Sequence, residues 1–111
     1  MQIKTKRLAR VSVVTVEGRV DHETAPSLSQ TLEQLLHEQA YNLVVDLSGV
    51  DYISSAGLRA LLNAHKATKG KQRGDVRLAA PRGQVQETIN LVGFDKIFRI
   101  YPELVDAVGS F

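Results

Sequence analysis

The sequence predicts an α/β fold in which strands alternate with helices along the chain. Residues 43–47 form a nearly continuous apolar run, which is typical of a central strand buried on both faces. Apolar residues recur at helical spacing over 24–39 and again from about 55 to 70. A second apolar run at 76–80 follows the later helix, so one strand–helix–strand unit lies directly after another.

The N-terminal region is predicted to form a hairpin. Ile3–Leu8 alternates apolar and polar residues, and Val11–Val16 is rich in β-branched residues. The turn between them falls at Ala9 and Arg10, and Gly18 is expected to end the second strand. The chain therefore opens with two strands.

Two longer helices follow in the predicted order. The first spans about Thr24–Gln39, with its first residue as a candidate cap and Pro26 in the first turn, where no backbone N–H is needed. The second begins at Ser54 or Ser55, either of which can cap it, and ends at Gly70. Each helix presents a row of leucines to a core.

The C-terminal third is predicted to contain shorter elements. Apolar residues from Val85 to Val92 mark a third helix, which Gly93 closes. A short strand at Ile97–Ile100 and a last small helix at Pro102–Val108 complete the chain. No internal repeat or linker interrupts this order.

Composition bounds the class of protein. The 111 residues contain no cysteine, 43% hydrophobic residues and 23% charged residues, which fits one domain over residues 1–111. The N-terminus leads into no apolar signal segment, and no run approaches the ~20 apolar residues of a membrane span. We therefore expect a cytoplasmic protein that is neither secreted nor membrane-spanning.

The charge pattern argues against a nucleic-acid partner. The formal net charge is only +2, and the chain has just three Tyr and three Phe to stack on bases. The loop over 69–74 is interpreted as a solvated turn, because it follows a helix and so cannot cradle a phosphate between a strand and a helix. The nearby basic residues are interpreted as solvated surface: Lys66, Lys69, Lys71 and Arg73.

No arrangement typical of catalysis is present. The chain lacks a GxSxG nucleophile elbow and a GxxxxGK[ST] phosphate loop. The histidines have no metal-ligand spacing: His22, His37 and His65. We therefore predict that the protein is not an enzyme and uses no cofactor or metal.

Small residues are concentrated where the central strand leads into the second helix. If that helix begins near Ser55, the Ser55 hydroxyl lies beside unpaired N–H groups and the positive end of the helix dipole. A phosphate there would be tolerated or stabilised by ~0.3–1 kcal/mol. The alternative interpretation is that Ser54 and Ser55 are only caps and Gly57 only a tight contact.

The same segment resembles a known family signature. Asp46–Leu58 is similar to the pattern D-L-x-x-V-x-[FY]-[ILM]-D-S-[ST]-G-L of STAS domains, specifically the bacterial anti-sigma factor antagonists. Upstream, Gly18–Ala25 resembles the family's turn into its first helix. Downstream, Leu78–Phe98 resembles the family's C-terminal pattern, so the resemblance covers essentially the whole chain.

The resemblance implies a fold and a partner switch. The implied STAS fold is a mixed sheet of four to five strands with about four helices, packed mainly on one side. In this family, the unmodified antagonist binds an anti-sigma factor that has serine-kinase activity, which frees a sigma factor for transcription. The kinase phosphorylates a serine to end the binding, and a metal-dependent serine phosphatase reverses the modification.

By register with the family's Gly-Leu pair, the phosphorylated serine falls on Ser55. Ser54 stands where the family has Asp and is an alternative acceptor, and Ala56 stands where the family has Ser or Thr. The resemblance brings the start of the second helix together with the turn before the first. The partner surface it implies contains Asp21, Thr24, Ser54, Ser55, Ala56, Gly57 and Arg59.

Two further expectations concern assembly. A different class of function is compatible with the same fold, namely a scaffold or adaptor subunit of a signalling or transport complex, with Ser55 acting only as a cap. The basic first strand, with Lys4, Lys6 and Arg7, could pair with another copy at a sheet edge, but its charges also discourage such pairing. We expect a monomer or a weak dimer.

Overall fold

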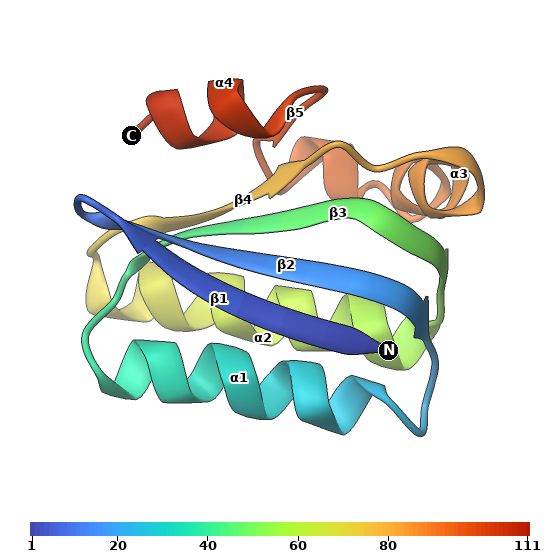
Figure 1. The fold of residues 1–111 in the computed structure, drawn as a ribbon, viewed down its shortest axis with the longest axis horizontal. Coiled ribbons are helices and arrows are strands. Elements are labelled where there is room, and N and C mark those ends of the chain that lie inside the picture. Colours follow the sequence, from blue (N-terminus) through green and yellow to red (C-terminus); the bar gives the residue numbers. More distant parts are fainter.

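The computed structural model describes all residues, 1–111, and contains one five-stranded mixed sheet. The strands lie in sequence order across the sheet, as Figure 1 shows. β1 and β2 are antiparallel, and every later pair is parallel. Their bounds are β1 Gln2–Leu8, β2 Val11–Val20, β3 Asn42–Ile53, β4 Asp75–Ala79 and β5 Ile100–Tyr101.

Four α-helices cover the sheet unequally. α1 and α2 lie side by side on one face, and α4 lies on the other (Figure 1). The larger core cluster, of 22 buried residues, contains residues of α1, α2 and α3, whereas α4 contributes to a cluster of only five. The predicted α/β fold, with helices mainly on one side, is therefore confirmed. The helices are α1 Ala25–His37, α2 Ser55–Lys71, α3 Gly83–Leu91 and α4 Leu104–Gly109.

The central strand is buried as predicted but is longer than predicted. Every residue of Leu43–Leu47 is buried, in agreement with a strand covered on both faces. β3 nevertheless continues to Ile53, while β4 pairs only with its first part, up to Asp46. The remainder of β3 pairs with β2 alone and is exposed at several positions, so it lacks the continuous apolar pattern of a buried strand.

Two glycines do not end the elements they were expected to end. Gly18 lies inside β2, where a φ of +95° fits a register irregularity between β2 and β3. Gly70 lies inside α2, and the helix ends instead at Lys71, followed by the C-cap residue Gln72 in the left-handed conformation. The tight turn that follows uses Gly74, where a Cβ would overlap the Tyr41 carbonyl oxygen.

The last strand also differs from its prediction. Ile97 follows a short 3-10 turn, Phe94–Lys96, and Phe98 is buried in the main core rather than paired in the sheet. The strand itself begins at Ile100 and pairs with the end of β4. Gly93 has a φ of +79° just after α3, which confirms it as the residue that closes the third helix.

Candidate partner-binding surface

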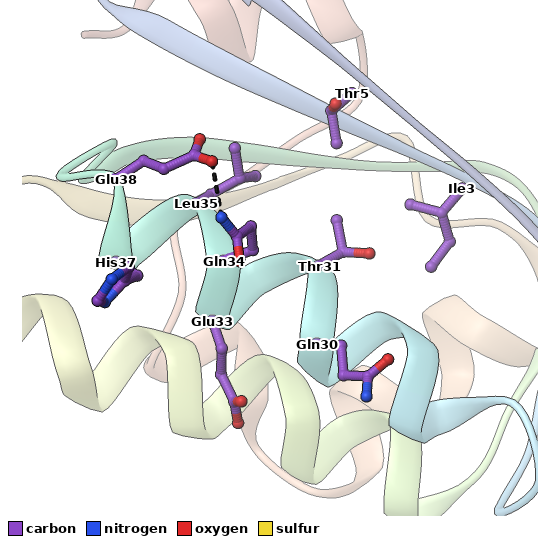
Figure 2. Close-up of a pocket in the computed structure, with 9 residues that line it drawn as sticks. All are labelled: Ile3, Thr5, Gln30, Thr31, Glu33, Gln34, Leu35, His37 and Glu38. Carbon is purple, nitrogen blue, oxygen red and sulfur yellow. Dashed lines mark hydrogen bonds between the residues drawn. The ribbon is translucent and has the colours of Figure 1, made fainter.

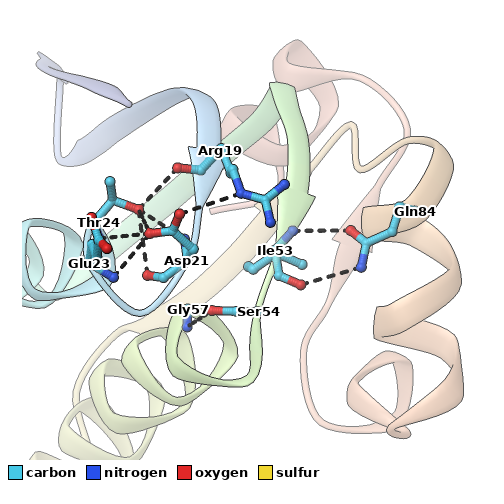
Figure 3. Close-up of polar contacts among 8 residues, drawn as sticks. All are labelled: Arg19, Asp21, Glu23, Thr24, Ile53, Ser54, Gly57 and Gln84. Atoms are coloured by element: carbon cyan, nitrogen blue, oxygen red, sulfur yellow. Dashed lines mark hydrogen bonds and ion pairs between the residues drawn. The ribbon is translucent and has the colours of Figure 1, made fainter.

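The candidate surface lies where β2 and β3 end and α1 and α2 begin. Ser54 joins these elements (Figure 3). Its backbone N–H donates to the Val20 carbonyl oxygen at 2.8 Å, which ties the start of α2 to the end of β2. Its hydroxyl accepts a hydrogen bond from the Gly57 N–H at 3.3 Å, so Ser54 is the N-cap of α2.

Gly57 allows the first turn of α2 to press against the strand ends. A Cβ at this position would lie 2.7 Å from Val20 Cγ1 and 2.8 Å from Ile53 Cγ1. Both distances are shorter than carbon atoms tolerate. A glycine is therefore required here by close approach of the helix to the sheet.

Ser55 is the first residue of α2 and is exposed. Its hydroxyl makes no hydrogen bond within the chain, in contrast to the capping hydroxyl of Ser54. The first turn of α2 contains no acidic residue, so its free N–H groups and the helix dipole leave a positive potential there. Arg59 is exposed one turn further along, which adds a positive side chain.

Asp21 organises the turn that leads into α1. Its carboxylate accepts hydrogen bonds from the N–H groups of Glu23 at 3.0 Å and Thr24 at 3.1 Å. These bonds, with the N–H of Thr24 contributing most, hold the pKa of the Asp21 carboxyl below its usual value. Thr24 occupies the cap position of α1, but its side chain makes no cap bond to the helix. Its hydroxyl instead accepts from the Asp21 N–H at 2.9 Å.

Sequence reasoning missed Arg19, which braces this turn from β2. The Arg19 guanidinium carbon lies 3.9 Å from the centroid of the Tyr52 ring. Its Nε also lies 3.4 Å from an Asp21 carboxylate oxygen. Arg19 and Tyr52 are register partners on neighbouring strands, so the stack spans β2 and β3. Only the strand register brings these residues together, and the local sequence carries no signal for it.

Gln84, at the start of α3, was also missed. Its side-chain oxygen accepts from the Ile53 N–H at 3.0 Å, and its side-chain nitrogen lies 3.4 Å from the Ile53 carbonyl oxygen (Figure 3). β3 continues past the end of β4. There the side-chain amide of Gln84 makes the hydrogen bonds that a neighbouring strand would otherwise make. Gln84 is a positioning residue for the turn that carries Ser54 and Ser55.

The two predicted halves of the surface do meet. A shallow groove of about 410 Å³ lies between the first halves of α1 and α2. Its lining includes His22 and Pro26, at the turn into α1, and Ala56 and Arg59, at the start of α2. The turn after Asp21 and the start of α2 therefore belong to one face of the molecule.

The chain contains no group of three His, Cys, Asp or Glu side chains placed to hold a metal ion. None of its helices is long and apolar enough to cross a membrane. The basic residues at the end of α2 and just after it do not act as one cluster: Lys69 lies 3.1 Å from a carboxylate oxygen of Asp75, while Arg73 lies over the Tyr41 ring.

Comparison with known proteins defines the class. The family model for the STAS domain matches residues 2–107. The chain is 34% identical over 100 residues to the anti-sigma-F factor antagonist RsfB of Mycobacterium tuberculosis, covering 88% of this chain and 79% of RsfB. It is 24% identical over 109 residues to the anti-sigma F factor antagonist of Paenibacillus polymyxa, covering 97% of this chain and 92% of that protein.

One solved structure supports the same class, and a more distant one shows the fold alone. The crystal structure of an anti-sigma factor antagonist from Mycobacterium paratuberculosis superimposes with a TM-score of 0.90 at 34% identity, covering 98% of this chain and 92% of the other. A sulfate transporter family protein from Wolinella succinogenes shares the fold alone, with a TM-score of 0.78 at 17% identity, covering 93% and 85%.

These findings place the chain in the STAS domain family. Within that family, it belongs to the anti-sigma factor antagonists. Members of this group are regulators of transcription rather than enzymes, which confirms the prediction that the chain is not an enzyme.

Proposed function

We propose that the unmodified protein binds an anti-sigma factor with serine-kinase activity through the candidate partner-binding surface, and that phosphorylation of Ser55 releases it. The observation that carries this proposal is the contrast between two adjacent hydroxyls. The Ser55 hydroxyl is exposed and unbonded at the start of α2, whereas the Ser54 hydroxyl is engaged in the cap. Ser55 is therefore the better acceptor of the two.

The physical basis of release is a change of charge at a contact. A phosphoserine adds about −1.5 to −2 charges at neutral pH. Burying that charge against a partner shaped for a hydroxyl leaves it poorly solvated. A mismatch of about 4 kcal/mol would lower the affinity roughly a thousandfold.

The fold itself tolerates the modification. The phosphate would lie at the positive end of the α2 dipole, where an anion is stabilised by about 0.3–1 kcal/mol. No acidic residue lies in the first turn of α2 to repel it. Release therefore requires no unfolding of the domain, and a metal-dependent serine phosphatase can restore the binding form by hydrolysing the exposed phosphoester.

The experiment combines mass spectrometry with binding. Protein purified from its native host with phosphatase inhibitors should carry a phosphate on Ser55, and Ser55→Ala should lose it, whereas Ser54→Ala should keep it. Ser55→Asp should weaken binding to the anti-sigma factor, and Ser55→Ala should leave it intact. Absence of phosphate under every growth condition, with Ser55→Asp binding unchanged, would favour the scaffold or adaptor function instead.

A further inference from the structure

The free edge of β1 is a second surface with the features of a binding site. β1 is the outermost strand of the sheet, and all seven of its residues pair with β2 without a bulge. Only Ile3 is half-buried, and the other six residues are exposed. The outward N–H and C=O groups of such a straight edge can pair with another strand. The opposite edge, at β5, has only two residues.

A groove lies beside this edge, between β1 and α1. Its volume is about 860 Å³. Figure 2 shows Ile3 and Thr5 on β1 and Gln30, Thr31 and Gln34 on α1 around the space. Ile3 and Thr5 pair with Val16 and Val14, which belong to the core beneath the sheet, so both point to the α1 side. A strand added to β1 would direct alternate side chains into this groove, and neutral side chains fit there because the carboxylates of Glu33 and Glu38 also line it.

The other side of the edge carries unpaired positive charge. Lys4 and Lys6 alternate with Ile3 and Thr5, so they lie on the opposite face of β1. Neither lysine makes an ion pair within the chain. An added strand would place its remaining side chains beside these two lysines, and acidic side chains would be favoured there.

Positive charge also gathers around the C-terminal end of β1. A pocket of about 420 Å³ is lined by Arg7, Arg10 and Arg73, together with neutral residues, and contains no carboxylate. Arg7 is oriented by a hydrogen bond from its Nε to the Ala9 carbonyl oxygen, and Arg73 by its position over the Tyr41 ring. None of the three arginines is part of an ion pair. The pocket is suited to a carboxylate-bearing chain that extends beyond the strand.

A second copy of this chain fits the edge poorly in the antiparallel registers that pair most of β1. In antiparallel self-pairing, a register centred on Thr5 places Lys4 opposite Lys6, and registers centred on either lysine place it opposite itself. Like charges directly opposite each other are destabilising. Charge complementarity therefore favours a different, acidic segment over a second copy of this chain.

We propose that the β1 edge and the arginine pocket bind an extended acidic segment of a partner protein, which adds to the sheet as a sixth strand. This site is separate from Ser55. The 17 residues of α2 run from Ser55 to Lys71, a length of about 25 Å at 1.5 Å per residue, and the arginine pocket lies toward the far end of that helix. The groove beside β1, in contrast, shares Gln30 and Glu33 with the groove between α1 and α2, so it adjoins the candidate partner-binding surface.

The test uses a labelled peptide of alternating glutamate and threonine, seven residues long, at low salt. Nuclear magnetic resonance of the full chain should show shifts at the β1 amides and at Arg10 and Arg73, and none at Ser55. The double variant Lys4→Glu with Lys6→Glu should weaken binding about tenfold, because two favourable contacts become repulsive. Lys66→Glu, on the exposed side of α2, is the matched control and should bind like the parent protein.

Backbone pairing is tested separately from charge. In an added strand, every second residue directs its N–H group toward β1. A peptide N-methylated at these residues should fail to bind, and a peptide N-methylated at the residues between them should still bind. A peptide of the same composition with its glutamates in one block should bind more weakly than the alternating peptide. Equal binding of both N-methylated peptides, or of the block peptide, would overturn the proposal, and so would an absence of shifts in β1.

Discussion

Gly57 sets how closely the first turn of α2 approaches the sheet, and this distance fixes where Ser55 stands. We predict that Gly57→Ala lowers the free energy of unfolding by about 1–3 kcal/mol, because the added methyl group would overlap Val20 and Ile53. Urea denaturation followed by circular dichroism measures the change. A loss of binding to the anti-sigma factor is expected as well, since the start of α2 must shift to relieve the overlap.

Gly70 provides the matched control for that substitution in the same helix. A Cβ at Gly70 would meet nothing within 4 Å, and the residue lies inside α2. Gly70→Ala should therefore raise the free energy of unfolding by up to about 1 kcal/mol through helix propensity. If Gly57→Ala also raised the free energy of unfolding, the added methyl group would not overlap Val20 and Ile53 as predicted.

At the scale of elements, the end of β3 depends on α3. We predict that Gln84→Ala leaves the buried N–H and C=O of Ile53 without their side-chain partner, at a cost of about 1–3 kcal/mol. Hydrogen exchange of the Ile53 amide should accelerate by more than that of Val45, in the middle of the strand. Gln86→Ala is the control, because Gln86 bonds only to Asn90 on the same exposed side of α3, and it should leave Ile53 exchange unchanged.

The elements also show what the sequence could and could not predict. The buried run Leu43–Leu47 and the spacing of leucines in α1 predicted those elements correctly, because each pattern is local and reflects the core it contacts. The extension of β3 to Ile53 could not be predicted in this way. It is stabilised by pairing with β2 and by Gln84, 31 residues away in the sequence.

The same reasoning applies to the candidate site. The start of α2 at Ser54 or Ser55 was predicted from the candidate caps and the small residues around them, which are adjacent in sequence, and the structure assigns the cap to Ser54. The brace formed by Arg19 and Tyr52 was not, because it depends on a register shift between two parallel strands. In this protein, local patterns predicted where the candidate site lies, and long-range pairing determines what holds its residues in place.

At the scale of the whole molecule, one charged cluster joins α2, β4 and the C-terminal end. Asp75 lies 3.0 Å from the Arg77 Nε and 3.1 Å from the Lys69 Nζ, and His65 Nδ1 lies 3.6 Å from its carboxylate. Arg77 also donates to the Ser110 hydroxyl at 2.7 Å and lies over the ring of Phe111, the last residue. Asp75 therefore joins α2 to Arg77, and Arg77 in turn holds the C-terminal residues.

Titration of this cluster should make stability depend on pH. Burial beside Phe98 lowers the pKa of the His65 imidazole below 6.5, and the nearby Lys69 adds to this effect, although Asp75 opposes it. The unfolded chain therefore binds a proton more readily than the folded chain, and stability should fall as the pH drops below 6.5.

Asp75 also makes stability depend on pH, but in a lower pH range. Burial raises its pKa, but the hydrogen bonds and charges of Arg77 and Lys69 outweigh burial and hold the pKa below 3.8. Its contribution is therefore lost as the pH falls from about 3.8 toward that lowered pKa.

Urea midpoints measured from about pH 8 to about pH 3 test both groups. His65→Gln removes the imidazole, so the loss of stability that begins below pH 6.5 should become smaller, while the loss below pH 3.8 should remain. Asp75→Asn should reduce the loss below pH 3.8 and lower stability at neutral pH, because Arg77 and Lys69 lose their charged partner. His37 is exposed on α1 and has no ion-pair partner, so His37→Gln is the control and should reproduce the parent curve. A His65→Gln curve that matches the parent would show that the buried imidazole is not the source of the pH dependence.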